Sequence, residues 1–521
     1  MTAAAAALGI GDRPGDARRG AAALILVVGL AYAPTLGNGL VWDDVPHIAD
    51  NSHVANLGAA TAYLLSPQGA YYRPLVFLGY AVERAAWGTA APGYHLTNLL
   101  LHIANTLLVW FVARRTGVAD TTALLGAAVF GLHPVQSEAV AYVSGRTDLL
   151  MTMAALLSWA ALLQSGPTLA RGIAAAAAGG LAMLSKESGY ALVLLWPWLA
   201  WRHGRSRRAR VALVAPGLAT ALLLVALRPG APPELAIALT ATRLAAVGRA
   251  IAGYTALLLW PVALQVDRLT VLSLASWQIA AGLIALTASA AVAGWGLSRR
   301  GAAADWTAWT IAFYLPVANL LALYPAIADR ALFTPEHNLY APLAGLGVLA
   351  AIGVERAAAL VPRSVRPVVP VLLALLLLTW AGLTAARCLV WHDEERLFGA
   401  AVAANSASPR VWYNYGNALL SRGAVDGAAD AFEGAAQRAP QDPAIWANLG
   451  VARQHQRSYD AAERAYRRAA ELAPADARIF ENLGTLYLAR GDLPAARAAF
   501  ATALRLDPSR TVAQRALAAL Q

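Results

Sequence analysis

The stretch from Pro92 to Arg115 reads PGYHLTNLLLHIANTLLVWFVARR and is apolar almost to its end, where two arginines follow. At about 1.5 Å per residue, a helix of this length crosses the hydrocarbon core of a bilayer, which is about 30 Å thick. His95, Asn98, His102 and Asn105 recur at helical spacing, so they share one face of that helix. A polar face avoids lipid, and it either bonds to neighbouring helices or lines a cavity. The stretch therefore predicts a membrane-spanning helix with one side turned towards protein.

The whole chain has the same character. Of its 521 residues, 58% are hydrophobic and only 14% are charged, which is typical of a polytopic membrane protein rather than a soluble one. The net charge of +11 comes from arginines clustered between apolar runs, and this positive-inside pattern sets orientation. We therefore predict a membrane protein with no nucleic-acid partner. The single cysteine, Cys388, excludes an intrachain disulfide.

About eleven apolar runs are long enough to span, or nearly span, a bilayer. They lie at about 21–40, 92–113, 119–137, 147–165, 172–187, 188–201, 211–228, 278–297, 306–325, 338–355 and 367–386. With the N-terminus inside, alternation places the arginine clusters in the cytoplasm, and the 41–91 loop and the C-terminus outside. The run at 248–265 would invert this alternation, so we interpret it as re-entrant or interfacial. The first run imitates a cleavable signal peptide, but Pro34 and an apolar continuation to Leu40 favour an uncleaved first helix.

From about residue 391 the composition changes to that of soluble helices, and a repeat of 34 residues appears. Equivalent positions in the three copies are Trp412, Trp446 and Phe480; Asn414, Asn448 and Asn482; Gly416, Gly450 and Gly484; Ala428, Ala462 and Ala496; Phe432, Tyr466 and Phe500; and Pro440, Pro474 and Pro508. Small residues let paired helices approach, aromatic rings fill the seam between them, and proline ends each second helix. The pattern predicts a solenoid of tetratricopeptide repeats at about 409–442, 443–476 and 477–510. The groove of such a solenoid holds peptide, and the three asparagines are the predicted acceptor contacts; a purely structural stalk is the alternative.

Ionisable residues gather in the segments that are predicted to face outward. Asp43 and Asp44 follow the first run, and the accompanying cations are Arg73, His133, Arg146, Lys186, Arg330 and His337. Glu138, Asp148 and Glu187 lie beside them and are predicted, with His95, Asn98 and His102, to line a cavity. Ionisable groups near a membrane pair or face water, so Arg146 with Asp148 or Glu138, and Lys186 with Glu187, are possible structural pairs.

An acidic pair among cations suits transfer from an anionic, phosphate-linked donor. One carboxylate accepts a proton from the acceptor, and the six cations are predicted to bind the donor phosphate and stabilise its departure. A transporter gate would have the same composition.

Several motifs, taken in order, resemble one family. They are WDD at 42–44, YYRPL at 71–75, GYHLTNLLLH at 93–102, LHPVQSEAVAYVSGRTDLL at 132–150, LSKESG at 184–189 and LYAPLAG at 339–345, followed by the repeats. The order resembles the transmembrane and tetratricopeptide-repeat O-mannosyltransferases of the GT-C glycosyltransferase superfamily. The resemblance covers essentially the whole chain, and HPVQSEAV followed by GRTDLL is its most specific part.

The resemblance implies an all-α fold, with a polytopic membrane domain over residues 1–390 and an extracytoplasmic repeat domain over residues 391–521. It also implies a polyprenyl-phosphate sugar as donor, typically dolichyl-phosphate mannose, and inverting transfer to a hydroxyl with an acid of the first outer loop as base. That acid is Asp43 or Asp44. We prefer Asp44, with the other orienting the acceptor or binding a cation, because neighbours in an extended segment point to opposite faces.

This chain departs from the family in two places. Its repeat array is shorter than that of eukaryotic members, and His337 stands where a basic residue precedes the family's LY-x-P. The Ala- and Arg-rich composition indicates a bacterial member, for which the carrier would be a lipid such as undecaprenyl phosphate and the sugar need not be mannose.

The sequence therefore predicts a multi-pass protein of the inner membrane that glycosylates exported polypeptides, with its active site and repeats on the extracytoplasmic side. Two alternatives stay open: a membrane scaffold without catalysis, and transfer to a lipid or polysaccharide. No His, Asp or Glu cluster has convincing ligand spacing, so we predict no obligatory metal or other cofactor.

Overall fold

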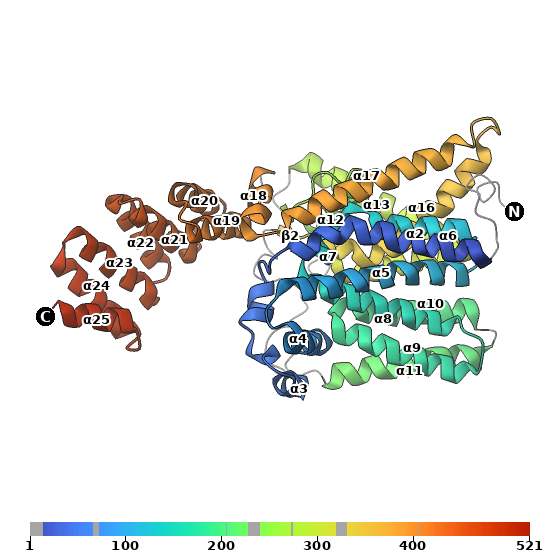
Figure 1. The fold of residues 1–521 in the computed structure, drawn as a ribbon, viewed down its shortest axis with the longest axis horizontal. Helices are drawn as coiled ribbons and strands as arrows, with labels where there is room; N and C mark the ends of the chain where they lie inside the picture. Colours follow the sequence, from blue (N-terminus) through green and yellow to red (C-terminus); the bar gives the residue numbers. More distant parts are fainter. Residues whose placement is uncertain are drawn as a thin grey trace. The chain divides into compact units, whose positions relative to one another are not determined.

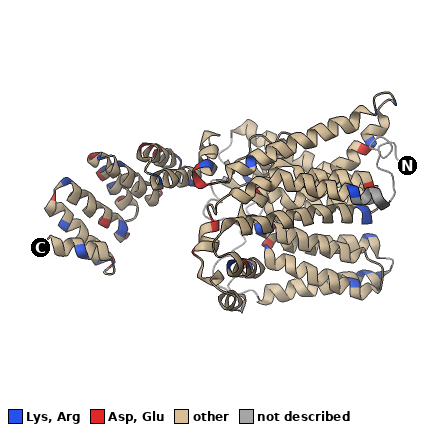
Figure 2. Ribbon diagram, in the orientation of Figure 1, with Lys and Arg blue, Asp and Glu red and all other residues tan. Residues whose placement is uncertain are grey.

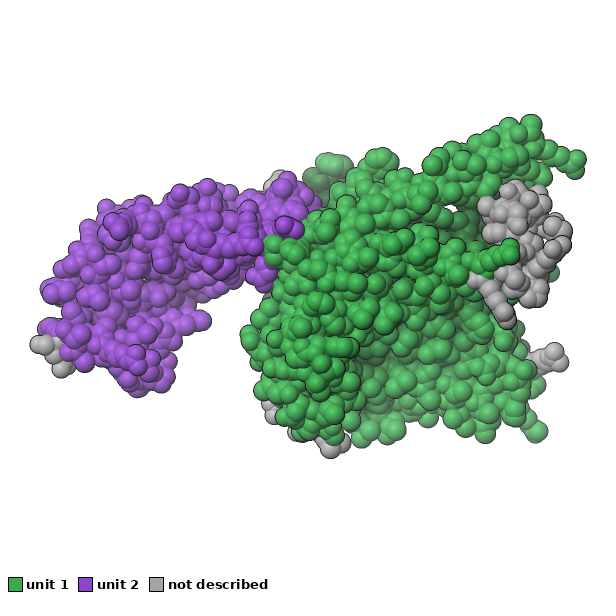
Figure 3. All heavy atoms as spheres, viewed as in Figure 1, with its two compact units in different colours: residues 1–264, 269–393 green, residues 265–268, 394–521 purple. Residues whose placement is uncertain are grey.

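The computed structural model describes residues 14–65, 72–204, 206–227, 240–271, 275–318, 331–404 and 406–520 (Figure 1). The chain divides into two compact units, coloured separately in Figure 3. Unit 1 comprises residues 1–264 and 269–393, and unit 2 comprises residues 265–268 and 394–521. Each unit is described by itself.

Unit 1 is a bundle in which every predicted apolar run forms a helix. Among the described residues, seven helices are long and apolar enough to cross a membrane: α2 (Pro14–Tyr32), α5 (Ala91–Arg115), α9 (Thr168–Ser185), α11 (Arg207–Leu227), α13 (Ser276–Ser298), α16 (Tyr340–Leu360) and α17 (Val368–Val390). The other four runs form shorter helices: α6 (Asp120–Leu132), α8 (Arg146–Leu162), α10 (Leu192–His203) and α14 (Ala302–Tyr314). The chain is thus a multi-pass membrane protein. Of the eleven predicted spans, seven form described helices that are long enough to cross the bilayer.

Short 3-10 turns adjoin each of the four shorter helices: η4 (Pro134–Gln136) follows α6, η5 (Val143–Gly145) precedes α8, η6 (Glu187–Ala191) precedes α10 and η7 (Leu315–Val317) follows α14. Helix α6 stops at His133, where Pro134 begins η4 and cannot continue the helical hydrogen bonds. In Figure 2 the long helices of unit 1 are tan over most of their length, and charged residues lie towards their ends.

The run interpreted as re-entrant forms the second half of α12 (Ala241–Leu259), which is not among the seven candidate spans. Glycines let α12 approach α13 closely: a Cβ on Gly248 would lie 1.8 Å from the carbonyl oxygen of Gly282. After α12, strand β1 (Leu269–Val271) pairs antiparallel with β2 (Ala331–Phe333), with Leu269 opposite Phe333. This two-stranded ribbon is an addition to the predicted all-helical architecture.

Short elements cap one end of the bundle and hold the candidate site. They are η1 (Ala33–Gly37), η2 (Val45–Ala49), η3 (Ser52–Val54), α3 (Leu57–Leu65), α4 (Pro74–Trp87), η4, α7 (Ser137–Ala141), η5 (Val143–Gly145), η6 (Glu187–Ala191), η7 (Leu315–Val317) and η8 (Glu336–Leu339). A buried cluster that includes Ile48, Tyr80, Tyr94 and Val143 packs the predicted 41–91 loop onto the bundle. The described parts of this segment, 41–65 and 72–91, therefore form a folded cap rather than an open loop.

Unit 2 is a stack of antiparallel helix pairs. Its helices are α18 (Glu394–Ala403), α19 (Pro409–Ser421), α20 (Val425–Arg438), α21 (Pro443–His455), α22 (Tyr459–Leu472), α23 (Ala477–Arg490), α24 (Leu493–Leu506) and α25 (Thr511–Ala519). In each repeat the glycine faces the aromatic ring: a Cβ on Gly450 would lie 2.5 Å from the ring of Tyr466. The predicted glycine–aromatic contact is confirmed, because the same approach recurs at Gly416 with Phe432 and at Gly484 with Phe500.

Candidate active site at the polar end of the bundle

The two adjacent aspartates have different surroundings. The segment is not extended as predicted: Trp42 has a φ of 54°, and Asp44 has helical angles where the π-helical turn η2 begins. A positive φ is uncommon for a residue as bulky as tryptophan. Asp44 is buried, whereas Asp43 keeps part of its surface exposed.

Asp44 is fully buried and ties the cap to the bundle. Its Oδ1 accepts hydrogen bonds from the backbone N–H and the hydroxyl of Ser144 at 2.7 and 2.8 Å. Its Oδ2 accepts from the backbone N–H groups of Val143 and Val41 at 3.3 and 3.4 Å. Burial raises the pKa of Asp44 to about 7, although these four donors favour the charged form and lower it. The carboxylate is enclosed, so the preference for Asp44 as the base is reversed.

Asp43 is only half-buried, and its carboxylate hydrogen-bonds to the side chain of Tyr142. Its backbone carbonyl accepts from the N–H of His47 at 3.0 Å, so the imidazole and the carboxylate share one turn. Burial lowers the pKa of His47, the charge of Asp43 raises it, and the charge of Arg73 lowers it. The His47 Nδ1 also lies 3.2 Å from the hydroxyl of Ser144. His47 therefore lies within electrostatic reach of both Asp43 and Arg73.

Three aromatic rings form a wall beside Asp43. Trp42 stacks on Tyr142 at 5.5 Å between ring centroids, and Tyr142 stacks on Trp391 at 5.3 Å. Trp391 and Tyr142 are buried, whereas Trp42 keeps part of its surface exposed. Offset stacking holds the rings in place, so the Asp43 side chain has a rigid neighbour.

Four of the six cations of the predicted donor site are each paired with an acid. The pairs that the structure forms are Arg73 with Glu187 at 2.8 Å, Arg146 with Glu83, Lys186 with Asp148 at 2.6 Å, and His337 with Glu138 at 3.0 Å. The sequence suggested other pairs: Arg146 with Asp148 or Glu138, and Lys186 with Glu187. The structure forms none of these among the described residues. The picture of one acidic pair among unmatched cations is therefore wrong.

Exposure separates these cations into two groups. Arg146 is 2% exposed and also donates to Asn98 Oδ1 and to the Tyr94 carbonyl, so it has no face left for a ligand. The Lys186 side chain is 10% exposed and both oxygens of Asp148 accept from its ammonium. Arg73 and His337 expose 22% and 20% of their side chains. These two can reach a ligand.

His133 and Arg330 complete the predicted set. His133 is buried, its Nε2 lies 3.0 Å from the Leu258 carbonyl oxygen, and its Nδ1 accepts from the Val135 N–H. Both ring nitrogens are used, so the prediction that His133 binds the donor phosphate is corrected to a structural role. Arg330 lies outside the described residues.

The polar face of α5 is buried in the bundle. His95 lies 3.2 Å from the Gly39 carbonyl oxygen, and Asn98 donates to the Val140 and Tyr142 carbonyls. His102 lies between the Tyr340 hydroxyl and the Gly131 carbonyl at 2.8 and 3.0 Å. The side chains of all four polar residues on this face are inaccessible to solvent. They join helices, so the prediction that His95, Asn98 and His102 line a cavity is corrected.

Glu138, Asp148 and Glu187, which were predicted to line the same cavity, are the acidic partners in three of the ion pairs. Glu138 is fully buried, and it also accepts from the His337 N–H at 3.0 Å. Asp148 is buried, while Glu187 is half-buried and bonded to Arg73 through Nε and Nη2.

In unit 2, the three predicted groove asparagines are all half-buried. Asn448 donates to the Tyr413 hydroxyl at 3.0 Å and to Asn417 Oδ1 at 2.9 Å, so its amide links two repeats. Asn414 and Asn482 occupy the same position in α19 and α23.

Sequence reasoning missed His47, Glu83 and Tyr340. His47 could have been found, because a residue four positions after Asp43 in a helical turn lies on the same face. Glu83 sits in an ordinary amphipathic helix, and only the fold brings it to Arg146. Within the described ranges, no three His, Cys, Asp or Glu side chains are grouped so as to hold a metal ion.

Comparison with known proteins finds both a family model and sequence relatives of this chain. A family model described as Tetratricopeptide repeat matches residues 395–443 and 448–511. Protein O-mannosyl-transferase Tmtc1 of Drosophila melanogaster is 35% identical over 150 residues, which are 27% of this chain and 17% of that protein. Tmtc2 of the same fly is 38% identical over 145 residues, 26% of this chain and 15% of that protein. Human TMTC1 is 31% identical over 176 residues, 29% and 19% of the two chains.

The chain thus spans 15–19% of the length of these relatives. Among solved structures, ArnT from Cupriavidus metallidurans bound to undecaprenyl phosphate is 15% identical and covers 88% of this chain and 80% of its own, with a TM-score of 0.36. That likeness is too weak to carry an argument. The chain is therefore a membrane protein with tetratricopeptide repeats that is similar, over 26–29% of its length, to the TMTC protein O-mannosyl-transferases.

Proposed function

We propose that this protein transfers a sugar from a polyprenyl-phosphate carrier to hydroxyl groups of exported polypeptides, with Asp43 as the base. The names of its relatives support a glycosyltransferase activity. The observation that carries the residue assignment is the contrast within the acidic pair: Asp44 is enclosed by four donors, whereas Asp43 is half-buried beside His47 and Arg73.

The proposed reaction is a single displacement. Asp43 takes the proton of the acceptor hydroxyl while the hydroxyl oxygen forms a bond to the anomeric carbon of the sugar. The bond between that carbon and the phosphate oxygen breaks, and polyprenyl phosphate leaves with the bonding electrons. Attack from the face opposite the leaving group inverts the anomeric carbon.

Arg73 and His337 are the proposed contacts for the leaving phosphate. Each keeps about a fifth of its side chain exposed, although each is paired with an acid. A positive group held in place by an acid is preorganised for the charge that develops on the phosphate. His47 remains neutral near pH 7 because its pKa is lowered, so it is suited to hold the Asp43 carboxylate or the acceptor by a hydrogen bond rather than by charge.

The test uses the purified full chain in vesicles with polyprenyl-phosphate mannose and Ser/Thr-containing peptides, read by mass spectrometry. Asp43→Asn is expected to reduce transfer by at least ~100-fold, the scale of a lost general base, without changing the unfolding temperature. Asp50→Asn is the matched control, because Asp50 is an exposed carboxylate of the same segment. Equal transfer by wild type and Asp43→Asn would reject Asp43 as the base. No transfer to any peptide, together with unchanged glycans on exported proteins in a deletion strain, would reject the function.

A further inference from the structure

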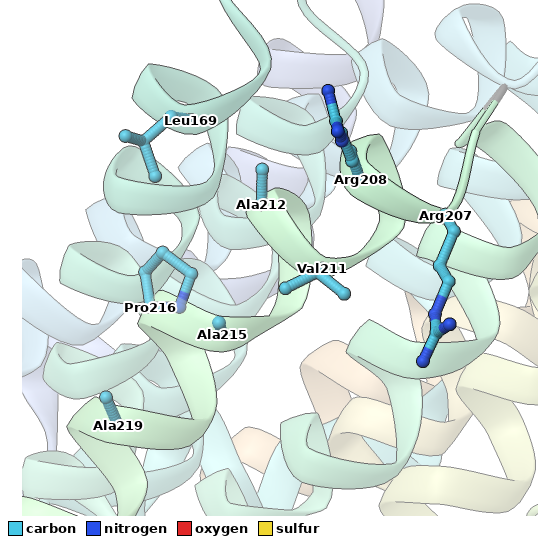
Figure 4. A pocket seen from close by; sticks show the side chains of 8 residues that line it. All are labelled: Leu169, Arg207, Arg208, Val211, Ala212, Ala215, Pro216 and Ala219. Atoms are coloured by element: carbon cyan, nitrogen blue, oxygen red, sulfur yellow. The ribbon is translucent and has the colours of Figure 1, made fainter.

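A groove lies at the far end of α9 from the candidate site. It runs between the first halves of α9 and α11, has a volume of about 610 Å³, and is within the size range of pockets that hold small molecules. Its lining is Leu169, Arg207, Arg208, Val211, Ala212, Ala215, Pro216 and Ala219 (Figure 4). Six of these eight side chains are apolar, and two are cations at one end.

The packing of the two helices explains why the groove exists. A Cβ on Gly172 would lie 2.2 Å from the Ala212 carbonyl oxygen, so α9 and α11 touch at backbone distance. Small side chains then continue along α11 at Ala215 and Ala219, while Leu169 and Val211 stand out on either side with 55% and 57% of their surface exposed. The result is an open apolar groove on the surface of unit 1.

The charge at the mouth of the groove has one sign. Arg207 and Arg208 open α11, where the helix dipole adds a partial positive charge. Both are exposed, and no acidic residue is among the eight that line the groove. By the positive-inside pattern this end faces the cytoplasmic leaflet, where basic clusters beside membrane helices attract anionic lipids.

We propose that this groove binds an anionic phospholipid, with its phosphate at the end of the groove that carries Arg207 and Arg208 and one acyl chain along Val211, Ala215 and Ala219. An apolar groove with two exposed arginines at its membrane-surface end and no acid in its lining fits such a lipid and discriminates against a zwitterionic one. The site is at the opposite end of α9 from Lys186 and Asp148, so the proposal is independent of the proposed chemistry at Asp43.

The experiment measures lipids bound to the full-length protein by native mass spectrometry, after titration with phosphatidylglycerol or phosphatidylcholine in detergent. Wild type is expected to bind phosphatidylglycerol at least tenfold more tightly. Arg207→Gln with Arg208→Gln is expected to weaken phosphatidylglycerol binding roughly 30-fold, which is the usual contribution of two basic residues at a membrane surface. This loss would remove most of the preference for phosphatidylglycerol. Arg299→Gln with Arg300→Gln is the matched control: it removes the same charge from another helix end predicted to lie on the same side.

A second variant fills the groove and keeps both arginines. Ala215→Phe with Ala219→Phe is expected to reduce phosphatidylglycerol binding as much as the arginine variant, and both alanines are exposed, so the larger rings do not disturb the helix packing. The proposal is overturned if the two arginine pairs contribute equally, because the attraction is then a general surface effect. It is also overturned if the groove-filling variant binds as wild type does, or if the two lipids bind equally.

Discussion

At the scale of single residues, the two adjacent aspartates differ in burial and in hydrogen bonding. Asp44 accepts four hydrogen bonds from Ser144, Val143 and Val41, and Asp43 keeps an open edge beside His47. A buried acceptor with four donors is a structural group, since each donor would be unsatisfied without it. An adjacent carboxylate with exposed surface is free for chemistry.

Asp44→Asn is expected to destabilise the fold by about 2–5 kcal/mol. If the amide oxygen stays with Ser144, the amide nitrogen faces the N–H groups of Val41 and Val143, so two buried donors lose their acceptor. The unfolding temperature in detergent is the measurement, and Asp50→Asn provides the reference. An unfolding temperature equal to that of wild type would contradict the structural role of Asp44.

His47 gives the cap a dependence on pH. Burial lowers its pKa below the usual value of about 6.5, so the folded state releases this proton more readily than the unfolded chain does. The stabilisation from keeping His47 neutral is present above pH ~6.5 and is lost as the pH falls through its folded-state pKa, at up to about 1.4 kcal/mol per pH unit. His47→Gln is therefore expected to flatten the decrease in stability between pH 7 and pH 5. His53→Gln is the control, and an unchanged slope in His47→Gln would refute the assignment.

At the scale of elements, buried ion pairs join segments that are distant in the sequence. Lys186, at the end of α9, reaches Asp148 in the first turn of α8, and both side chains are at least nine-tenths buried. The attraction in such a pair does little more than offset desolvation, but a lone buried charge is costly.

Lys186→Met is accordingly expected to cost about 3–5 kcal/mol, because it leaves Asp148 charged and unmatched. Adding Asp148→Leu to this variant should recover most of the loss. Arg468→Met is the surface comparison, since its pair with Glu471 is exposed and such pairs contribute about 0–1 kcal/mol. The measurement is thermal unfolding of all three variants. If the double variant were less stable than Lys186→Met, the unmatched Asp148 charge would not be the cause of the loss.

The same pairs mark how far the sequence could predict the site. Each apolar run that was found in the sequence forms a helix of unit 1. The runs also placed Asp43, Asp44, Lys186 and His337 correctly in the segments between the long helices. The sequence could not show which acid pairs with which cation. Neighbouring side chains at the start of a helix point to different faces, and the partner of each charge lies on another element. Local reasoning therefore joined Lys186 to Glu187, whereas the fold joins it to Asp148.

At the scale of the whole molecule, the chain crosses between its two units more often than the sequence indicates. The repeat pattern predicts the second unit from about residue 391, but residues 265–268 also belong to it. Asp267 is buried there and accepts from the Ser408 hydroxyl at 2.5 Å and from Arg410 Nη2 at 2.5 Å. Gln265 donates to the Ala404 carbonyl at 3.2 Å. About 140 residues separate these partners, and no periodic signal connects a single short segment to a repeat array over such a distance.

Asp267→Ala is expected to loosen the start of the repeat unit. It removes the acceptor of Ser408 and Arg410 and costs about 1–3 kcal/mol, because the Ser408 hydroxyl stays buried without its partner. Limited proteolysis of the full chain measures this as faster cleavage between residues 394 and 409, with the helices after α19 still protected. Asp430→Ala is the control, since Asp430 is an exposed carboxylate of the same unit. If both variants are cleaved at the wild-type rate, the Asp267 contacts do not stabilise the unit, and its stability resides in the glycine–aromatic seams of the repeats alone.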